Sequence, residues 1–508
     1  MKLKKLEKIF SDMTKKTLPD KFLYLPILIL GIYFLFRLID QAKMIFTFPL
    51  DKFNDWSSYM AQLYFLKECG FHNFCEYWYN GFINFQINQP GWYFFTYPLY
   101  SITNNVQLTT YLSLIIIFIL SLTALYISRK KLELSKTKIL AFFLFFFGNA
   151  VSIGNFIRLG KIHGLFGWFN TIVIFLFLLI YKDKKLDKNF FFIIPFYFFA
   201  ILSHQNSAVI SSLAILGLFL IKSFKEKLSI IISVLITIIA TSFWWIDYIK
   251  NFFNTTSATI IVGDTLRQLN RATLNDNLVA TLIPIIFFII LYFYLKSNAN
   301  RKKELIFFLP LIIVAFLLLT RLILFIPIIN RVFPDAYGLF LLFFIIFMLF
   351  KIDFNLINKY KTLIFIGLIF ISILSVILNM IFTPLFIEHT ELEKETLSIF
   401  PEIENRFVLL ATPLRRTSYP NAYYSYAAIF HNLKSAGGWY PSAVSQNYIN
   451  KLDSLDNLVK SKNCELLKKT LVELNTTEVV TYDEHCKILE ECGFNKKINK
   501  LRVCLYSS

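Results

Sequence analysis

Long apolar segments alternate with short polar ones through most of the chain, and this pattern predicts a bundle of membrane helices. A hydrocarbon core of about 30 Å needs about 20 apolar residues in an α-helix. Eleven segments reach or approach this length: 22–40, 107–127, 139–157, 163–181, 189–203, 207–221, 228–249, 278–295, 305–326, 336–350 and 362–386. We therefore expect a polytopic α-helical membrane domain over residues 1–387 with about 11 transmembrane helices.

The pattern changes beyond residue 387. Short apolar runs at 406–411, 478–482 and 501–506 are bounded by polar residues and predict strands. Segments near 424–435 and 464–474 predict helices. Residues 388–508 are therefore expected to form a small α/β domain.

Composition supports the membrane interpretation. Of 508 residues, 56% are apolar and only 17% are charged, against about 25% charged in a soluble domain. The net charge is +19, which by itself would be compatible with nucleic-acid binding. Residues 388–508 hold 15 basic and 15 acidic side chains, so the whole excess lies in the apolar part of the chain. Its distribution there favours membrane topology, and no nucleic-acid partner is expected.

The polar joins between the predicted spans fall into two alternating sets. Joins 1–21, 128–138, 182–188, 222–227, 296–303 and 351–361 hold 26 Lys and Arg residues, whereas the other joins hold only 9. Cytoplasmic loops are enriched in Lys and Arg. We therefore expect a cell-membrane protein with a cytoplasmic N-terminus and an extracytoplasmic C-terminal domain.

All six cysteines lie in segments expected on the extracytoplasmic side of the membrane, where disulfides are permitted. Cys69 and Cys75 are placed to close a small loop. The remaining four allow three pairings, and the sequence does not choose among them.

The first outer loop, 41–106, is long and rich in aromatic residues. We expect it to lie on the membrane surface as short amphipathic helices. The hairpin between Lys188 and Lys222 is too short for two full spans, so its tip at 203–207 is expected below the outer surface. Together with the polar tip at 158–162, it predicts a cationic cavity that opens to the outer leaflet.

Two carboxylates open the first outer loop. Asp51 and Asp55 are four residues apart, so on a helix both would lie on one face. A carboxylate there can act as a general base or bind a divalent metal. The alternative is that Asp51 caps a helix and Asp55 is simply solvated.

Cationic side chains near the outer ends of the spans are candidates for binding a lipid phosphate. Ionisable groups at membrane depth are costly and commonly functional. The alternatives are snorkelling to the headgroups for the arginines and lysine, and a satisfied polar hairpin tip for the second histidine. The candidates are Arg158, Lys161, His163, His204, Arg321 and Arg331.

The segment SAGGWYPSA, 435–443, predicts a tight turn at Gly437 and Gly438 that presents Trp439 and Tyr440. Stacking on a sugar ring is one interpretation of these aromatics. Packing against the rest of the protein is the favoured one.

Several short motifs occur in an order that resembles a known family. Asp55-Trp56 opens the outer loop, and GFHNFCEYWYNGFINF (70–85), YFFTYPLY (93–100), RLGKIHG (158–164) and SHQNSA (203–208) follow. This order resembles the membrane proteins whose domain is labelled 6-pyruvoyl-tetrahydropterin synthase-related, which in turn resemble the type C (GT-C) glycosyltransferases. The resemblance spans most of residues 20–387, and the tail resembles the outer domain of such proteins.

The resemblance implies an integral-membrane glycosyltransferase that transfers a sugar from a polyprenyl-phosphate donor to an extracytoplasmic acceptor. An acidic residue at the start of the first outer loop is catalytic in that class, and Asp55 matches it best, with Asp51 the alternative. The join 158–162 carries no Asp or Glu, and the tail lacks the Trp-Trp-Asp motif of metal-using oligosaccharyltransferases. No cofactor is certain, and a divalent metal, although compatible with the carboxylates, is disfavoured.

A second hypothesis is a non-catalytic protein that binds, flips or exports a lipid-linked glycan or polymer. It predicts that Asp55 is dispensable while the cations are not. Under both hypotheses the partners are a lipid-linked sugar and membrane lipids.

Overall fold

The computed structural model describes residues 17–50, 55–252, 274–326, 334–412 and 420–507. Contacts within the chain divide it into two units. Residues 1–41, 114–242 and 264–385 form the first, which we call the helical unit. Residues 42–113, 243–263 and 386–508 form the second, the mixed unit. Packing therefore groups the first outer loop with the C-terminal segment, whereas the sequence pattern suggested a division at residue 387.

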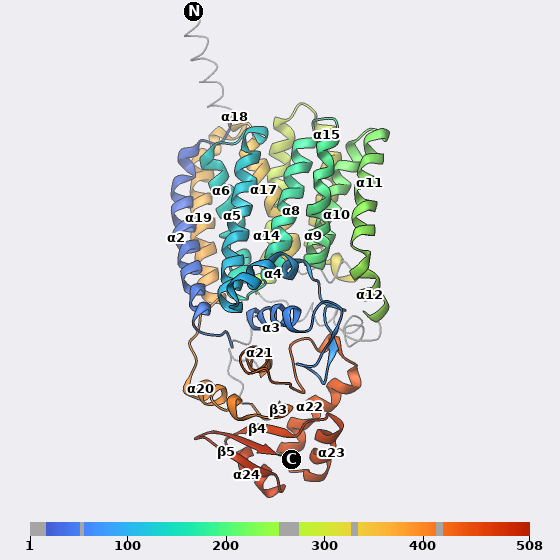
Figure 1. The fold of residues 1–508 in the computed structure, drawn as a ribbon. Coiled ribbons are helices and arrows are strands. Elements are labelled where there is room, and N and C mark those ends of the chain that lie inside the picture. Colours follow the sequence, from blue (N-terminus) through green and yellow to red (C-terminus); the bar gives the residue numbers. More distant parts are fainter. Residues whose placement is uncertain (1–16, 51–54, 253–273, 327–333, 413–419, 508) are drawn as a thin grey trace, which may run out of the picture. The chain divides into compact units, whose positions relative to one another are not determined.

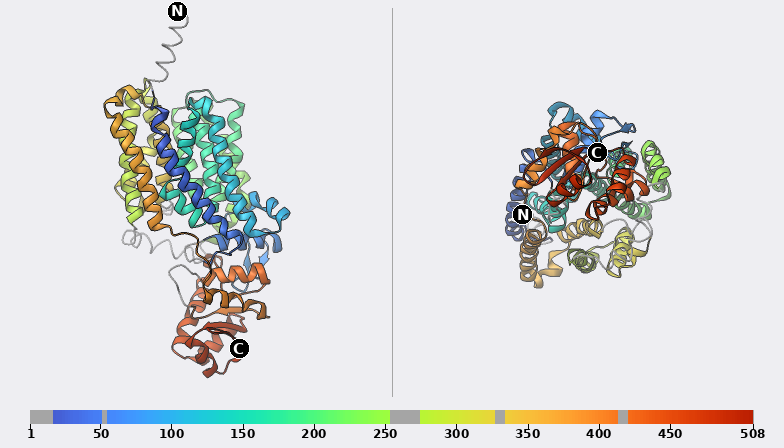
Figure 2. Two further views of the ribbon diagram at one scale, coloured as in Figure 1. Left: turned by 90° about the vertical axis from the view of Figure 1, so that its left-hand side faces the viewer. Right: turned by 90° about the horizontal axis from the view of Figure 1, so that it is seen from below.

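The helical unit consists of apolar helices that run side by side (Figures 1 and 2). They are α2 (Tyr24–Gln41), most of α5 (Val106–Leu132), α6 (Lys136–Phe147), α8 (Ile162–Tyr181), α9 (Ile193–Ser203), α10 (Gln205–Ile221), α11 (Phe224–Ala240), α14 (Leu274–Ser297), α16 (Leu309–Leu319), α17 (Pro334–Lys351) and α19 (Lys361–Phe382). Shorter pieces complete the unit: η1 (Asp20–Phe22), α7 (Ala150–Ser152), η3 (Ile153–Arg158), η4 (Lys188–Phe192), α15 (Arg301–Phe307), η5 (Leu322–Phe325), α18 (Phe354–Ile357) and η7 (Asn358–Tyr360).

Helix α8 is the most enclosed of the candidate spans, with 78% of its apolar window buried. Phenylalanine rings supply much of the packing around it. Phe175 of α8 lies 4.9 Å from Phe343 and 5.0 Å from Phe344 of α17, measured between ring centroids. Tilted and edge-on ring contacts at these distances are favourable beyond the area that they bury. The high phenylalanine content of the sequence therefore serves helix packing here.

Each of the eleven predicted spans contains helix within the described residues. In the part of the chain that the structure describes, five helices are long and apolar enough to cross a membrane, or seven if two bent pairs are each counted as one span. The apolar helices Lys188–Ser203, Gln205–Ile221 and Leu309–Leu319 are shorter, as expected for the hairpin between residues 188 and 222. How many segments cross the membrane, and how deep that hairpin tip lies, remain predictions.

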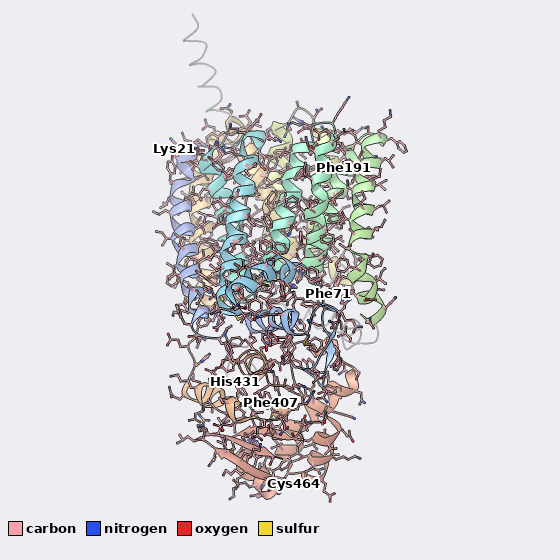
Figure 3. All side chains as sticks on the ribbon, in the orientation of Figure 1. Lys21, Phe71, Phe191, Phe407, His431 and Cys464 are labelled. Carbon is pink, nitrogen blue, oxygen red and sulfur yellow. A yellow bond between two sulfur atoms is a disulfide. The ribbon has the colours of Figure 1, made fainter. Side chains whose placement is uncertain are left out.

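Basic joins gather at one end of the helical unit. Lys21 and Phe191, which lie in or beside two of these joins, are at the same end in Figure 3. Helices α15 and α18, from two further basic joins, lie at that end in Figure 1. This arrangement agrees with the alternation of charge along the sequence. Which end faces the cytoplasm remains a prediction.

The predicted span 139–157 is broken. Helix α6 ends at Gly148, and the Asn149 side chain accepts hydrogen bonds from the backbone N–H groups of Val151 and Ser152, so it starts a new helix. The two helical pieces are bent by 52°. The second piece continues as the π-helix η3 (Ile153–Arg158). Such π segments are rare and often occur at functional sites.

The mixed unit combines helices with two sheets. Its helices are α3 (Trp56–Glu68), α4 (Gly91–Thr103), α12 (Ser242–Phe252), α20 (Glu391–Leu397), α21 (Pro420–His431), α22 (Gln446–Lys460), α23 (Cys464–Glu473) and α24 (Glu484–Glu491), with short η2 (Ala42–Ile45), η8 (Phe400–Glu402) and η9 (Pro441–Ala443). Its strands are β1 (Phe74–Cys75), β2 (Phe82–Ile83), β3 (Phe407–Leu409), β4 (Glu478–Tyr482), β5 (Asn495–Asn499) and β6 (Val503–Ser507).

The larger sheet has the order β3-β4-β6-β5, with β3 parallel to β4 and the other pairs antiparallel. The three strands and two helices predicted for the C-terminal segment are confirmed. Strand β5 was not predicted because it is a mostly exposed edge strand of sequence NKKIN. Without a buried face, such a strand has no apolar alternation to reveal it.

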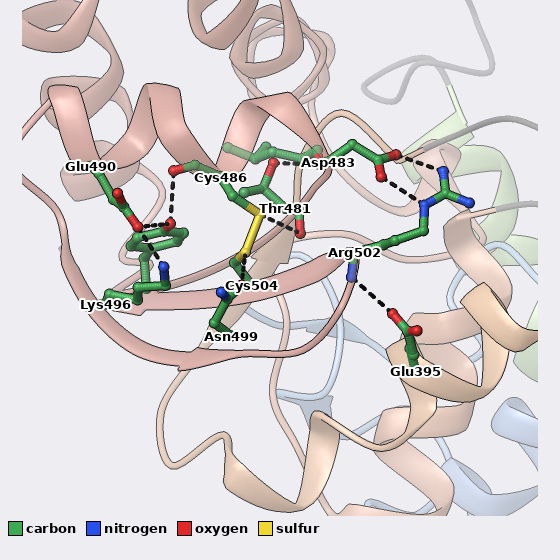
Figure 4. The surroundings of a disulfide bond; sticks show 11 residues. Glu395, Thr481, Asp483, Cys486, Glu490, Lys496, Asn499, Arg502 and Cys504 are labelled. Atoms are coloured by element: carbon green, nitrogen blue, oxygen red, sulfur yellow. Dashed lines mark hydrogen bonds and ion pairs between the residues drawn. A yellow bond between two sulfur atoms is a disulfide. The ribbon is translucent and has the colours of Figure 1, made fainter.

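Three disulfides join parts of the mixed unit. Cys69 and Cys75, which were placed to close a small loop, form a bridge, and the four C-terminal cysteines pair as Cys464–Cys492 and Cys486–Cys504. The Cys486–Cys504 bridge ties α24 to β6 (Figure 4). Beside it, Arg502 forms two hydrogen bonds to the Asp483 carboxylate, at 2.7 and 2.8 Å. These links fasten the end of β4 to the start of β6.

Candidate functional site

Asp55 lies at the start of helix α3 in the mixed unit. Its backbone carbonyl accepts hydrogen bonds from Tyr59 N at 3.2 Å and from Ser58 Oγ at 2.8 Å. Its carboxylate does not cap the helix, and the residue is partly buried. Asp51, the alternative candidate, lies outside the described residues. The position of Asp55 is therefore held by its backbone, and its carboxylate takes part in interactions other than capping.

Three tyrosine hydroxyls lie within electrostatic range of Asp55. Tyr59 comes from α3, Tyr93 from α4 and Tyr440 from the segment before η9. Burial raises the pKa of all three hydroxyls, and the negative charge of Asp55 raises each further. The hydroxyls therefore remain protonated over the physiological pH range and can donate hydrogen bonds beside the carboxylate.

Helix α3 is buried on most sides, since ten of its thirteen residues are buried. This burial does not fit the amphipathic helix expected in the first outer loop, and whether the loop lies on the membrane surface remains a prediction. The reason lies in tertiary packing: α3 contacts both α4 and α21 of the same unit. Ser57, Ser58 and Gln62 of α3 thus face protein rather than solvent, whereas Lys67 and Glu68 at its end are exposed.

The glycine-rich segment 435–440 packs against the first outer loop. The Trp439 indole N–H donates a hydrogen bond to Ser57 Oγ at 3.0 Å. A Cβ atom on Gly438 would lie 2.7 Å from the Trp78 ring, so only glycine permits this approach. The favoured interpretation, packing of Trp439 and Tyr440 within the protein, describes what the structure shows at this segment.

Arg158 ends the π-helix η3 in the helical unit and is 3% exposed. Its Nε donates a hydrogen bond to the Pro384 carbonyl oxygen at 2.7 Å. Arg37 Nη2 donates to the same oxygen at 3.2 Å, and Arg37 Nη1 lies 4.0 Å from Asp40 Oδ2. Arg158 is therefore buried within the helical unit and bound to backbone.

Lys161, His163 and His204 come together where α8 begins and the α9–α10 hairpin turns. The His163 ring hydrogen-bonds to the backbone of Ser203. His204 Nδ1 accepts from Asn206 N at 3.1 Å and so caps α10. Lys161 and His163 both lie within electrostatic range of His204. The structure therefore joins three of the predicted cationic candidates in one cluster, which we call the hairpin-tip cluster.

Arg321 lies elsewhere in the helical unit, at the end of α16. Its Nη2 donates to Thr281 Oγ1 at 3.1 Å and to Asn277 Oδ1 at 3.3 Å. These contacts tie α16 to the start of α14. Arg331 lies outside the described residues. The cationic residues predicted from the sequence thus do not all lie in one cluster.

The buried polar residues of the helical unit that were not predicted as site residues include two pairs. Asn155 Nδ2 donates to Asp335 Oδ2 at 2.7 Å, linking η3 to the start of α17. Arg37 and Asp40 form the second pair. Their spacing of three residues within an apolar span was a usable signal, because it places both on one helix face. In the sequence, Arg37 contributed only to the count of basic residues.

A metal ion would need several donor side chains close together. Among the described residues, no group of three or more His, Cys, Asp or Glu side chains lies close enough to hold an ion. Asp51 does not belong to those residues. The expectation about a divalent metal therefore remains a prediction.

No protein-family profile matches the chain, and no curated protein matches it in sequence. Its fold is similar to that of two solved structures. The archaeal oligosaccharyltransferase AglB from Archaeoglobus fulgidus, in complex with an inhibitory peptide and a dolichol-phosphate, matches over 90% of this chain and 69% of its own, with a TM-score of 0.54 and 12% identity. The arabinofuranosyltransferase AftD from Mycobacteria matches over 97% of this chain and 40% of its own, with a TM-score of 0.60 and 11% identity.

This chain therefore spans less than half the length of AftD. The similarity shows that the chain shares the fold of AglB and AftD. At 11–12% identity it shows the fold alone. The 6-pyruvoyl-tetrahydropterin synthase-related label remains a prediction.

Proposed function

We propose that the protein is an integral-membrane glycosyltransferase that transfers a sugar from a polyprenyl-phosphate-linked donor to an acceptor outside the membrane. The observation that carries the proposal is the position of Asp55. This carboxylate opens helix α3 in the first outer loop of a GT-C fold, beside a set of protonated tyrosine hydroxyls. A partly buried carboxylate among neutral donors is suited to accept a proton from an attacking hydroxyl.

In the proposed reaction, the acceptor hydroxyl attacks the anomeric carbon of the sugar. The bond between that carbon and the phosphate oxygen breaks, and the lipid phosphate leaves with its negative charge. Asp55 takes the proton of the acceptor hydroxyl. Cationic side chains stabilise the phosphate as charge develops on it.

The hairpin-tip cluster is the first candidate for the phosphate. Lys161 and His204 lie close together there, and the lysine can carry positive charge, whereas burial and the lysine charge lower the pKa of His204 to about 4. Arg158 and Arg321 remain candidates, although each already binds protein oxygens. The solved AglB complex contains a dolichol-phosphate, which is the class of lipid that we propose for this chain.

The Asp55→Asn variant tests the proposal. Asn preserves the size of the side chain but cannot accept the proton, so transfer should fall by at least about 100-fold. The measurement is transfer of radiolabelled sugar from a panel of polyprenyl-phosphate monosaccharides in membranes that contain the protein. Asp353→Asn is a matched control, because Asp353 caps α18 through one side-chain oxygen that Asn retains.

Full activity of the Asp55→Asn variant would contradict the assignment of the base. The alternative of a binder, flippase or exporter predicts a different pattern of binding and transfer. In that case the wild type binds the labelled donor without transferring sugar, and Lys161→Gln abolishes binding while Asp55→Asn does not.

A further inference from the structure

A groove opens on the flank of the helical unit, between the end of α5 and the start of α6. Its volume is about 320 Å³, which falls in the range of about 300–1,000 Å³ typical of ligand pockets. The two helices are joined by a short turn at 133–135, and the groove lies beside that turn. The lining residues are Leu122, Thr123, Tyr126, Lys136, Ile139 and Leu140.

Most of the lining is suited to a hydrocarbon chain. Leu122, Ile139 and Leu140 offer only apolar atoms to the groove. Ile139 is buried, whereas Leu140 and Tyr126 are exposed, so the groove opens to the surroundings of the helices. Lipid chains surround the helices of a membrane protein and are as apolar as leucine. An acyl chain therefore matches the apolar part of this groove.

Two cationic side chains lie at the groove. Lys136 lines it directly and is exposed. The guanidinium carbon of Arg129 lies 4.6 Å from the ring centroid of Tyr126, which is also a lining residue. This cation–π contact holds the guanidinium close to the groove. Both residues belong to the join 128–138, which contains five Lys and Arg residues and one acidic residue.

Glu133 and Asp20, which are carboxylates at this end of the helices, contact other groups. Glu133 Oε2 lies 2.7 Å from Lys351 Nζ. Asp20 Oδ1 accepts a hydrogen bond from Ser135 Oγ at 2.8 Å. The positive charge of Lys136 and Arg129 is therefore available to an anion. Lysine and arginine side chains form strong, charge-assisted hydrogen bonds to phosphate.

We infer that the groove is a binding site for an anionic glycerophospholipid of the surrounding membrane. An acyl chain lies against Leu122, Ile139 and Leu140, and the phosphate is paired with Lys136 and Arg129. Basic pockets between membrane helices are known to bind anionic headgroups in this way. The inference goes beyond the proposed function and does not depend on it.

The lipid-linked donor is another lipid phosphate, but its first candidate site lies at the opposite end of the helices. Ser135 of the turn contacts Asp20, which precedes Lys21, and Lys21 and Phe191 lie at one end in Figure 3. Helix α9 begins beside Phe191 and ends at Ser203, next to the hairpin-tip cluster. The groove and that cluster therefore lie at opposite ends of the unit.

A segment of the same chain is a further possible occupant. Residues 1–16 contain six lysines and two acidic residues. Their positive charge would be repelled by Lys136 and Arg129. The charge of the groove therefore favours an anionic lipid over this segment.

The experiment compares two lipids that differ in headgroup charge. The full-length protein in detergent, stripped of copurified lipid, is titrated with phosphatidylglycerol or with phosphatidylcholine of the same acyl chains. Native mass spectrometry gives the affinity of the first bound lipid. Phosphatidylglycerol should bind at least about fivefold more tightly, and Lys136→Gln should weaken its binding about fivefold, the effect of one basic side chain near an anionic headgroup. Adding Arg129→Gln should remove the preference.

Lys225→Gln is the matched control. Lys225 is an exposed lysine in the first turn of α11, as Lys136 is in α6, but it does not line the groove. Its loss should leave the affinity for phosphatidylglycerol unchanged. Thr123→Trp fills the groove and should weaken the binding of both lipids. If Thr123→Trp does not fold, as judged from its thermal unfolding without lipid, Leu140→Trp fills the same groove.

Three results would overturn the inference. One is equal affinity of the wild type for the two lipids. Another is an effect of Lys225→Gln as large as that of Lys136→Gln, which would show attraction to the basic joins in general. The third is unchanged binding in a folded groove-filling variant. Displacement of phosphatidylglycerol by an equal concentration of polyprenyl phosphate would assign the groove to the donor lipid instead.

Discussion

Lys182 shows that a charged residue in a predicted polar join can have a buried side chain. It follows α8 in a join that the sequence assigns to the cytoplasm, yet it is only 5% exposed. Its Nζ lies 2.6 Å from Glu304 Oε1 of α15 and donates to the Tyr294 hydroxyl of α14 at 3.2 Å. The Tyr294 hydroxyl in turn donates to Glu304 Oε2 at 3.2 Å. This buried group therefore joins the ends of three helix segments.

We predict that Lys182→Met lowers the free energy of unfolding by about 3–5 kcal/mol, because Glu304 is left buried without a counter-charge. Adding Glu304→Gln should recover most of the loss. Thermal unfolding in detergent measures both variants. Lys303→Met is the control: Lys303 pairs with Asp183 near the surface, where an ion pair contributes about 0–1 kcal/mol. Equal losses for Lys182→Met and Lys303→Met would contradict the buried-pair account.

At the scale of elements, the hairpin-tip cluster depends on how closely α8 approaches the turn between α9 and α10. A Cβ atom on Gly167 of α8 would lie 2.1 Å from Ser207 Oγ and 3.4 Å from Ser203 Cβ. This glycine therefore lets α8 contact the hairpin, and the same contact brings His163 to Ser203. The cluster follows from helix packing rather than from the motifs alone.

We predict that Gly167→Ala destabilises the protein by about 1–3 kcal/mol, the usual cost of overpacking a close contact. Gly367→Ala is the matched control, since a Cβ atom there meets nothing within 4 Å. In the interior of α19 it should be neutral or stabilise by up to about 1 kcal/mol. Both are read from thermal unfolding midpoints. A Gly167→Ala protein as stable as Gly367→Ala would show that the close approach is not required.

At the scale of the whole molecule, the two units differ in the interactions that stabilise each of them. Helices of the helical unit are packed through apolar and aromatic side chains. The mixed unit adds three disulfides, and none of the described cysteines is free. Disulfides persist in oxidising compartments. This agrees with the topology predicted from the basic joins, in which the C-terminal segment lies outside the cell membrane.

We predict that the denatured, unreduced protein takes up no maleimide label and that reduction exposes six thiols. The replacement of both Cys486 and Cys504 by Ala should lower stability by about 2–4 kcal/mol, because the bridge restricts the unfolded chain. Mass spectrometry counts the labels, and thermal unfolding gives the loss. Labelling of the C-terminal cysteines without reductant would contradict an oxidised, extracytoplasmic mixed unit.

Much of the secondary structure was predictable because it depends on local pattern. The apolar spans, the strands at 407–409 and 478–482 and the Cys69–Cys75 bridge each follow from neighbouring residues. Asp55 was also recognisable as a candidate, from its place after the first span. Strand β5 was missed because it has no apolar face, and the burial of α3 was missed because α21 covers it from far along the chain.

The candidate site was predictable in part, and the difference has a physical cause. Charge and residue type marked Arg158, Lys161, His163, His204 and Arg321, but their contacts depend on distant segments. Arg158 binds the carbonyl of Pro384, and Arg321 binds α14. Local pattern identifies which residues can carry charge. It does not say which of them face one another after packing.

The sequence by itself determined that the chain is a multi-span membrane protein with an α/β C-terminal segment, because hydropathy, strand alternation and the distribution of Lys and Arg are local properties. Tertiary structure alone decided what surrounds Asp55. Trp439 meets Ser57 across 382 positions of sequence, and Tyr440 follows it to the same helix. Hydrogen bonds act only over about 3 Å, so contacts between segments so far apart exist only once the chain has folded.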